Sequence, residues 1–339
     1  MRIPRFIRHA LSSCVAAALL AGCGGSQPPI GAPGAMPQAP ISAAHADRGT
    51  SWLGTKAKEG DLVYAASAFG NVNILAWPSL RRMSRFREPN YDTSRGICSD
   101  TRGHVFVTAV KNVGPTGEIL DYAHGQKTPN ATLSEKTGYL PFDCASDPTT
   151  RNLAVTDWCY SCNKDKGSGS VAIFKATRGD ATRYTDPSIR TYEYVGYDNK
   201  GNLFVCGDSG GYAGQIFAML PKGSKTFTDI SLNQDVCGFG RVQWDGQYMT
   251  IEKSPNRAIY RVAVSGSSGT IVGTTTLNDN TKVPVGEAWF DLPRSLVIVP
   301  ESHQQHDVGS FSYPGGNKIT QSKTHLRRTW SVTLSVAPN

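Results

Sequence analysis

An aspartate that recurs in a similar local context at near-constant spacing constrains the fold of this chain more than any other feature. It ends the short sequences CSD, ASD, GYD, QWD and WFD, at Asp100, Asp147, Asp198, Asp245 and Asp291. Successive copies are 47, 51, 47 and 46 residues apart. Self-similarity at such a period indicates a repeat architecture, in which each repeat is one supersecondary unit.

Each aspartate is followed by a polar turn and then by a short run rich in β-forming residues. These runs lie at 105–110, 153–158, 203–208, 248–253 and 296–301, and a sixth lies at 62–67. A further amphipathic strand follows each run, as in GEILDY and GQIFAM, and no helical period of useful length occurs between 60 and 336. In DTRG and DNKG, Asp can cap the turn and Gly can adopt a positive φ. Four-stranded units of this length, stacked radially, predict a β-propeller.

The two ends of the repeat array predict how the ring closes. The first copy has no strand before 62–67, and an orphan run, TWSVTLSV at 329–336, follows the last copy. We therefore predict an all-β, six-bladed β-propeller that is closed by this C-terminal strand in blade one. Closure would remove a pair of exposed sheet edges.

Parts of the repeats resemble a known family. PFDCASDPTTRNLAVTD at 141–157, VGYDNKGNLFVCGDSGGYAGQIF at 195–217 and IEKSPNRAIYRV at 251–262 are similar to NHL-type repeats. The wider group includes SMP-30/gluconolactonase-like hydrolases and streptogramin lyases. The resemblance extends over roughly 60–336 and implies the propeller fold. It leaves two functions open: a binding module, or a metal-dependent hydrolase or lyase.

Four of the β-rich runs end in an acid. In propellers, ligands usually bind over the central channel, on the face where these strands end. Asp157, Asp208, Glu252 and Glu301 are therefore candidate binding residues, because converging carboxylates can hold Ca²⁺ or act as acid and base. Alternation along the strands points Asp157 and Glu252 away from Asp208 and Glu301. A hydrogen bond from each acid to its own loop is the competing expectation.

Two further sets of residues are candidates for a divalent cation. By resemblance to SMP-30-like enzymes, Glu287 in VGEAWFD would be a ligand at the channel mouth, although the other ligands of that family have no matched counterpart in this chain. In ESHQQHD, Glu301, His303 and His306 combine carboxylate and imidazole groups, which suit Zn²⁺ or another transition metal. A polar surface loop is the alternative interpretation of that segment.

The N-terminal segment reads as an export signal. Arg2, Arg5 and Arg8 precede an apolar stretch that is too short to span a bilayer. The stretch ends in LAGC, which resembles the lipobox of bacterial lipoproteins and implies cleavage before Cys23 and lipidation of its thiol. We expect a signal peptide at 1–22, a flexible tether rich in Gly, Pro and Ala at 23–51, and a single propeller domain at 52–339.

Six cysteines remain after Cys14 and Cys23 are set aside. An even number of cysteines in an exported protein indicates disulfide bonds, because an oxidising compartment favours them. Inner strands of adjacent blades would bring Cys98 next to Cys144, and Cys206 and Cys237 would lie towards one face. This favours the pairs Cys98–Cys144, Cys206–Cys237 and, within one loop, Cys159–Cys162, out of fifteen possible connectivities. A thioredoxin-like redox site is disfavoured for Cys159 and Cys162 because that site needs a helix start.

The net charge of the chain and its predicted export together limit the kinds of partner that it could bind. Removal of 1–22 would leave 32 Lys and Arg residues against 27 acids, which is a mild positive balance. Export makes nucleic acid an unsuitable partner. We expect membrane lipid at the anchor, and an envelope protein, a polysaccharide or a small ligand at the propeller face. Gly24 stands where an inner-membrane retention Asp would lie, which favours the outer membrane of the cell envelope if the host has one.

Overall fold

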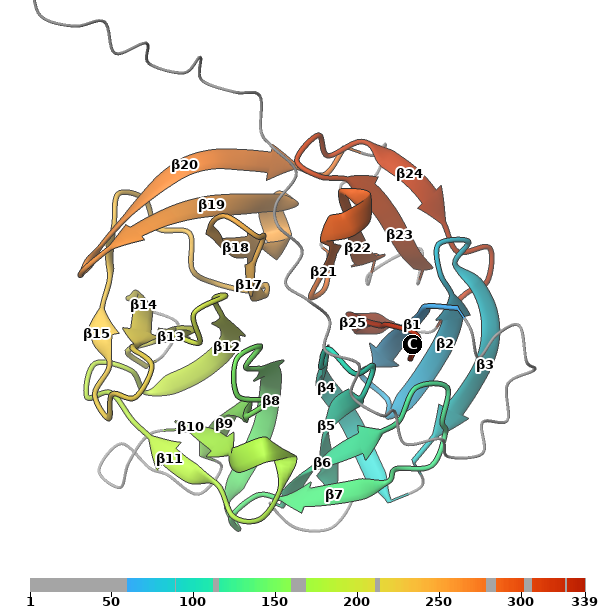
Figure 1. Cartoon of the computed structure of the whole chain (residues 1–339), viewed down its shortest axis with the longest axis horizontal. Helices are drawn as coiled ribbons and strands as arrows, with labels where there is room; N and C mark the ends of the chain where they lie inside the picture. Colours follow the sequence, from blue (N-terminus) through green and yellow to red (C-terminus); the bar gives the residue numbers. More distant parts are fainter. Residues whose placement is uncertain are drawn as a thin grey trace, which may run out of the picture. The chain divides into compact units, whose positions relative to one another are not determined.

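The protein forms six small antiparallel sheets arranged in a ring, which confirms the prediction of a six-bladed β-propeller (Figure 1). The computed structural model describes residues 60–88, 90–111, 116–159, 169–210, 214–278, 285–301, 307–326 and 328–338. The expected signal peptide and tether lie outside these residues, as do 52–59 of the expected domain. No helix within the described ranges is long and apolar enough to cross a membrane.

Blades one to three each contain four strands, which follow one another from the centre of the ring outward. Blade one is β25 (Thr329–Ser335), β1 (Leu62–Ser67), β2 (Asn71–Ala76) and β3 (Arg81–Arg87). Blade two is β4 (Tyr91–Ser99), β5 (Val105–Lys111), β6 (Gly117–Tyr122) and β7 (Ala131–Ser134). Blade three is β8 (Tyr139–Ser146), β9 (Leu153–Cys159), β10 (Ser170–Phe174) and β11 (Thr182–Tyr184).

Blades four to six follow the same plan, and blade five has an additional strand. Blade four is β12 (Thr191–Tyr197), β13 (Leu203–Asp208), β14 (Gln215–Leu220) and β15 (Thr228–Asp229). Blade five is β17 (Val242–Trp244), β18 (Met249–Lys253), β19 (Ala258–Ser265) and β20 (Ser268–Thr276), with β16 (Ser231–Leu232) parallel to β20 at the rim. Blade six is β21 (Trp289–Asp291), β22 (Leu296–Glu301), β23 (Asp307–Ser312) and β24 (Lys318–Gln321). Three single-turn 3₁₀ segments, η1 (Lys175–Thr177), η2 (Ser254–Asn256) and η3 (Leu292–Arg294), lie in turns.

The C-terminal strand closes the ring in blade one, as predicted. β25 pairs antiparallel with β1, in a register that places Leu62 opposite Ser335 and Val63 opposite Leu334. The first blade is therefore assembled from both ends of the propeller sequence.

The hydrophobic core lies between the blades. Alternation along each strand sends successive side chains to opposite faces of a blade. Along β1, Leu62 and Tyr64 pack against blade two, whereas Val63 and Ala65 pack against blade six. All six blade junctions contain a buried apolar cluster of this kind. Each blade is therefore stabilised by its two neighbours.

Four of the five recurring aspartates cap the turn between the first and second strands of their blades, whereas the carboxylate of Asp291 accepts hydrogen bonds from Trp77 and Arg294 instead. Asp198 Oδ1 accepts the N–H groups of Lys200 and Asn202 at 2.9 and 2.8 Å. Gly201 in this turn has a φ of +84°, and a Cβ there would come within 2.7 Å of Thr149 Oγ1. The predicted Asp-capped turn with a required glycine is therefore present.

Two predicted disulfides join neighbouring blades. Cys98 on β4 is bonded to Cys144 on β8, and Cys206 on β13 is bonded to Cys237 in the segment before β17. The Cα atoms are 5.7 Å apart in both pairs. Cys159 is also in a disulfide, and its expected partner, Cys162, lies outside the described residues.

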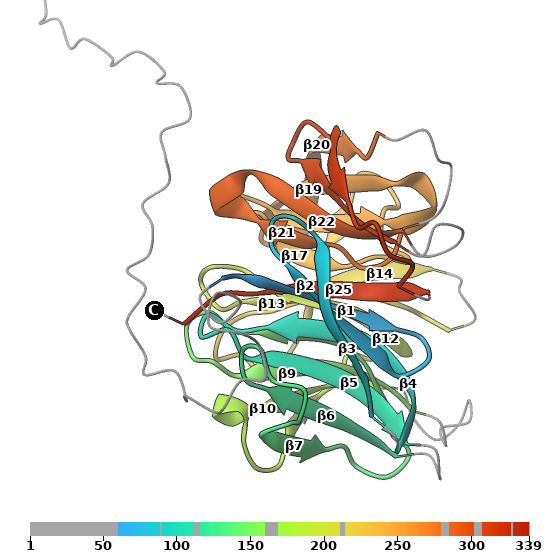
Figure 2. The same ribbon diagram turned by 90° about the vertical axis from the view of Figure 1, so that its right-hand side faces the viewer.

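The ring has two distinct faces, seen edge-on in Figure 2. On the terminus face lie the turns between first and second strands, the turns between third and fourth strands, and both ends of the described chain. There, the ring of His124 contacts both Gly60 O, at 3.1 Å, and Ser335 Oγ, at 2.7 Å. On the opposite side, the loop face, each second strand ends and the chain passes from one blade to the next.

Candidate functional site at the centre of the ring

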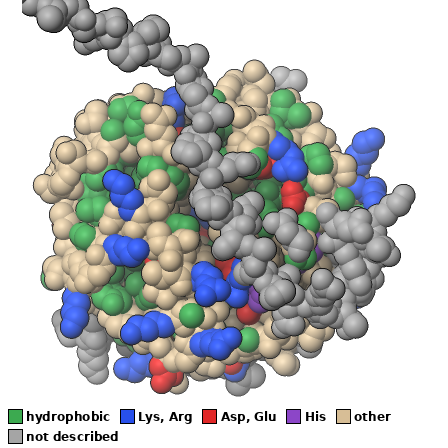
Figure 3. All heavy atoms as spheres, in the orientation of Figure 1, with side chains coloured by type: hydrophobic (Ala, Val, Ile, Leu, Met, Phe, Trp, Pro, Cys, Tyr) green, Lys and Arg blue, Asp and Glu red, His purple; other side chains and the backbone are tan. Residues whose placement is uncertain are grey.

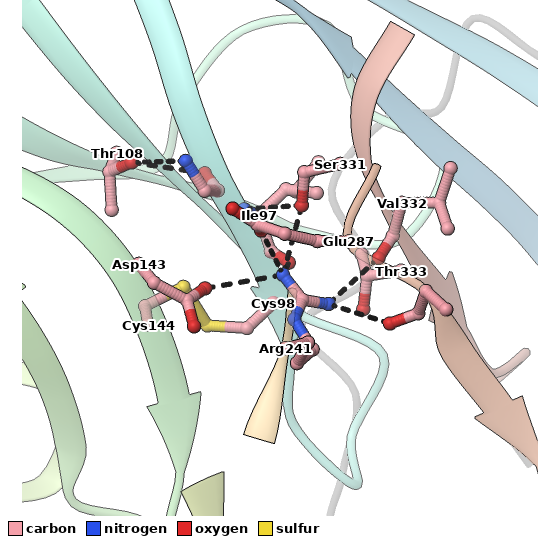
Figure 4. Close-up of polar contacts among 12 residues, drawn as sticks. Ile97, Cys98, Thr108, Asp143, Cys144, Arg241, Glu287, Ser331, Val332 and Thr333 are labelled. Carbon is pink, nitrogen blue, oxygen red and sulfur yellow. Dashed lines mark hydrogen bonds and ion pairs between the residues drawn. A yellow bond between two sulfur atoms is a disulfide. The ribbon is translucent and has the colours of Figure 1, made fainter. Parts of the chain in front are cut away.

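A single guanidinium group connects five of the six blades at the centre of the ring. Arg241 directly precedes β17 in blade five, and only 3% of its side chain is exposed. Its Nη2 donates to Ile97 O of blade two at 2.7 Å and to Ser331 Oγ of blade one at 2.9 Å. Its Nη1 donates to Val332 O of blade one at 2.9 Å (Figure 4).

Two buried carboxylates balance the charge of Arg241. Asp143 of blade three lies 3.2 Å from Nη2, and Glu287, just before β21 of blade six, lies 2.8 Å from it. Burial raises the pKa of Asp143, and Arg241 opposes that rise. Burial also raises the pKa of Glu287, and the nearby Asp143 raises it further. One cation facing two buried acids favours retention of a proton in this cluster.

Irregularities in the inner strands lie at Asp143 and at Glu193, and the first of them presents Asp143 to Arg241. The register of β8 against β9 shifts between Pro141 and Cys144, and that of β12 against β13 shifts between Tyr192 and Tyr194. Such bulges re-aim a side chain and leave backbone groups unpaired. Thr156 of β9 fills this need, because its hydroxyl donates to Glu193 O at 2.7 Å and accepts from Asp143 N–H at 3.0 Å.

Asp157, one of the predicted binding acids, is held within its own blade. Its carboxylate accepts hydrogen bonds from the Ser170 hydroxyl, at 2.9 Å to Oδ2, and from Arg183 of β11. Arg183 also pairs with the buried Glu135 of blade two. Burial raises the pKa of Asp157 to about 7, the charge of Glu135 adds to the rise, and Arg183 opposes it.

The other three predicted binding acids, Glu252, Glu301 and Asp208, each contact partners different from those of Asp157. Glu252 Oε2 accepts the N–H of Ala288 at 2.9 Å and that of Arg241 at 3.3 Å, and burial raises its pKa to about 7. Glu301 binds Lys318 at 2.9 Å and lies 3.7 Å from Arg257. Asp208 accepts the N–H of Gly210 at the start of its loop. Each acid on the second strands is therefore engaged by a separate set of partners.

The structure places the candidate metal ligands apart from any common centre that it describes. Glu287, the residue suggested by the SMP-30-like resemblance, is paired with Arg241. Glu301 is paired with Lys318, whereas His303 and His306 lie outside the described residues. In the described part of the chain, no three His, Cys, Asp or Glu side chains are grouped so that they could hold a metal ion.

Aromatic side chains of blades one, three and five lie on the loop face. The Arg95 guanidinium of blade two lies 4.7 Å from the ring centre of Trp158, and Trp158 stacks on Phe142 at 4.6 Å. Phe239, beside the end of β18, is 45% exposed, and Phe69, after β1, is 48% exposed. Ser254 N–H donates to Phe239 O at 2.6 Å and so fixes the Phe239 backbone at the end of β18.

Sequence reasoning missed the residues that occupy the centre. Arg241 and Asp143 precede or interrupt inner strands, outside the second-strand positions that the repeat alignment singled out. The available signal was a charged residue within an otherwise apolar or glycine-rich segment, as in CGFGRVQW and PFDCAS. A buried charge at such a position needs a partner, but the sequence does not indicate which blade supplies it.

Comparisons with known proteins show the fold. No protein-family model and no curated protein matches the sequence. A chain of a nidogen/laminin complex is similar in structure, with a TM-score of 0.61 and 11% identity, over 83% of this chain and 100% of that one. A protein of unknown function from Bacteroides caccae is similar with a TM-score of 0.58 and 10% identity, over 82% of this chain and 99% of that one. At these identities the similarity establishes the β-propeller architecture alone.

Proposed function

We propose that this chain is an exported, lipid-anchored propeller of the NHL type that acts as a binding module at the bacterial cell envelope. Its partner is a protein that the loop face recognises. The lipobox-like LAGC at Cys23 supports the anchor. The two inter-blade disulfides support export, because such bonds persist in oxidising compartments.

The observation that carries the binding role is the set of aromatic side chains on the loop face. Five large hydrophobic side chains are exposed among the described residues, and the two aromatic ones, Phe69 and Phe239, both lie there. Trp158 lies beneath Arg95, and its buried Nε1 has no hydrogen-bond partner within the described structure. Aromatic and arginine side chains are enriched in protein-binding hot spots. The nidogen/laminin structure shows that a similarly folded chain occurs in a protein complex.

The pairing of the acids supports binding over the SMP-30-like hydrolase. That alternative needs a group of carboxylates free to hold a divalent cation at the channel mouth. In this ring Glu287 is neutralised by Arg241, and Asp157 and Glu301 by basic residues of their own blades. Carboxylates that already bind side chains or backbone N–H groups are poor ligands, because a metal would have to displace those partners.

Site-specific photo-crosslinking in intact cells tests this proposal. A photoreactive phenylalanine analogue would replace Phe239 on the loop face or, as a matched control, Val272 on the outer strand β20, which is 46% exposed. We expect one discrete protein adduct from position 239 and none from position 272. The proposal is wrong if position 239 gives no adduct, or if both positions give the same adducts.

A further inference from the structure

Six exposed basic side chains gather on the terminus face, in the turns of blades three and four. They are Arg151, Lys175, Arg178, Lys200, Lys222 and Lys225, and together they define the basic face. Figure 3 views the ring from this side and shows Lys and Arg side chains grouped over its left and lower parts, where Figure 1 places blades four and three.

The acids in the same turns do not cancel this charge at the surface. Asp147 and Asp198 are buried, and their carboxylates accept hydrogen bonds from residues of their own turns. Asp180 is the exposed acid of these turns. Within the described structure, none of the six basic side chains forms an ion pair, and Lys222 Nζ donates to the hydroxyl of Thr149 at 2.9 Å. The six basic side chains therefore project into solvent, whereas the carboxylates of Asp147 and Asp198 point inward and do not pair with them.

The chain approaches the ring on this same face. Gly60, the first described residue, is held there by His124, and β1 begins two residues later at Leu62. Whatever tether connects the ring to an anchor at Cys23 must join it at the terminus face. A long tether by itself leaves either face free to turn towards the membrane. A charged surface beside the point of attachment would remove that freedom.

We propose that the basic face docks on the anionic headgroups of the membrane in which Cys23 is anchored, so that the loop face points away from the bilayer. This inference rests on the lipid anchor of the proposed function. A Lys or Arg side chain near an anionic lipid surface strengthens binding about fivefold, and the effect weakens as salt shortens the Debye length. Several such side chains on a tethered domain suffice to orient it.

Vesicle binding by the non-lipidated full chain isolates the contribution of the basic face. The Cys23→Ser chain would be sedimented with vesicles of phosphatidylcholine alone, or of phosphatidylcholine with phosphatidylglycerol. A triple variant, Lys175→Glu with Lys200→Glu and Lys225→Glu, reverses charge on the basic face. A matched control with the same change in net charge, Lys136→Glu with Lys253→Glu and Lys323→Glu, alters the other side of the ring. Replacement of the first three lysines by Gln provides a milder variant.

We expect the Cys23→Ser chain to prefer anionic vesicles, with a preference that falls as salt rises. The Gln variant, which removes three positive charges, should lose about a hundredfold in partitioning, and the Glu variant, which also adds three negative charges, should lose more. The control should stay within about threefold of the unchanged chain. Equal losses in both Glu variants, or no preference for anionic vesicles, would overturn the docking. Binding of dextran sulfate without vesicle binding would also overturn it, in favour of a polysaccharide partner.

Detergent-phase partitioning separates this result from the anchor itself. The chain with Cys23 intact should enter the detergent phase whether or not the basic face is altered, because the acyl chains alone determine that behaviour. If the unaltered chain stays in the aqueous phase, the lipid anchor is wrong whatever the vesicles show. If it enters the detergent phase but shows no preference for anionic vesicles, only the docking is wrong.

Discussion

Arg241 illustrates how one residue can be critical to a ring of repeats. Its guanidinium hydrogen-bonds to blades one and two and pairs with acids from blades three and six, while its own backbone belongs to blade five. Buried charges of this kind contribute little when they are complete, because desolvation offsets their attraction. They become costly when one partner is removed. We therefore expect the cluster to favour correct closure over misassembled rings.

Replacement of Arg241 by Met is expected to lower the free energy of unfolding by about 3–5 kcal/mol, because Asp143 and Glu287 would then be buried without a counter-charge. Urea denaturation followed by tryptophan fluorescence measures this loss. Arg102→Met, which breaks a more exposed pair with Asp100, should cost no more than about 1 kcal/mol. Similar losses in the two variants would show that Arg241 has no central role.

Glu193 is expected to make the stability of the ring depend on pH. Burial raises the pKa of its carboxyl to about 7, and the charge of Asp208 adds to the rise. A carboxyl whose pKa is higher in the folded state than in the unfolded state stabilises the fold at pH values below the unfolded pKa. That contribution is lost as the pH rises through the folded pKa. Glu193→Gln should therefore gain roughly 2 kcal/mol relative to the unchanged chain between pH 5 and pH 8. An identical difference in unfolding free energy at the two pH values would contradict this assignment.

At the scale of the elements, the features that follow the repeat period were predicted correctly from the sequence. The Asp-containing turns and the second strands recur at near-constant spacing, so their positions follow from the period. The first copy lacks a first strand, and the unpaired run at 329–336 supplies it. β16 could not be predicted, because its two residues have no alternation of their own and pair in parallel with β20 only after blade five has folded. The charged cluster around Arg241 was not predicted for a similar reason. The partners of Arg241 come from positions far apart in the sequence, such as Asp143 and Ser331.

The two inter-blade disulfides should contribute comparably to stability. Their sequence separations are 46 and 31 residues, and the loop-entropy relation gives about 4 kcal/mol for each. The double variants Cys98→Ser with Cys144→Ser, and Cys206→Ser with Cys237→Ser, would be compared by denaturant unfolding. A loss well under about 1 kcal/mol in either variant would mean that the blades hold together without that bond.

For the whole molecule, the centre of the ring holds the blades together, and the proposed binding function is assigned to the two faces. Five of the six blades meet around Arg241, while exposed aromatic side chains lie on the loop face and the six residues of the basic face lie on the terminus face. On this account the ring is a rigid platform that binds partners at its faces. A metal-dependent enzyme would instead need the central acids for its own chemistry.

Metal content is the most direct test of that claim. The full chain would be purified without chelators, passed through gel filtration and analysed for divalent cations by mass spectrometry, beside the Glu287→Gln variant. We expect only substoichiometric metal in both proteins, because Arg241 already neutralises Glu287 and the second-strand acids have partners of their own. One equivalent of calcium or zinc per chain, lost in Glu287→Gln, would contradict the account and indicate a metal-dependent hydrolase.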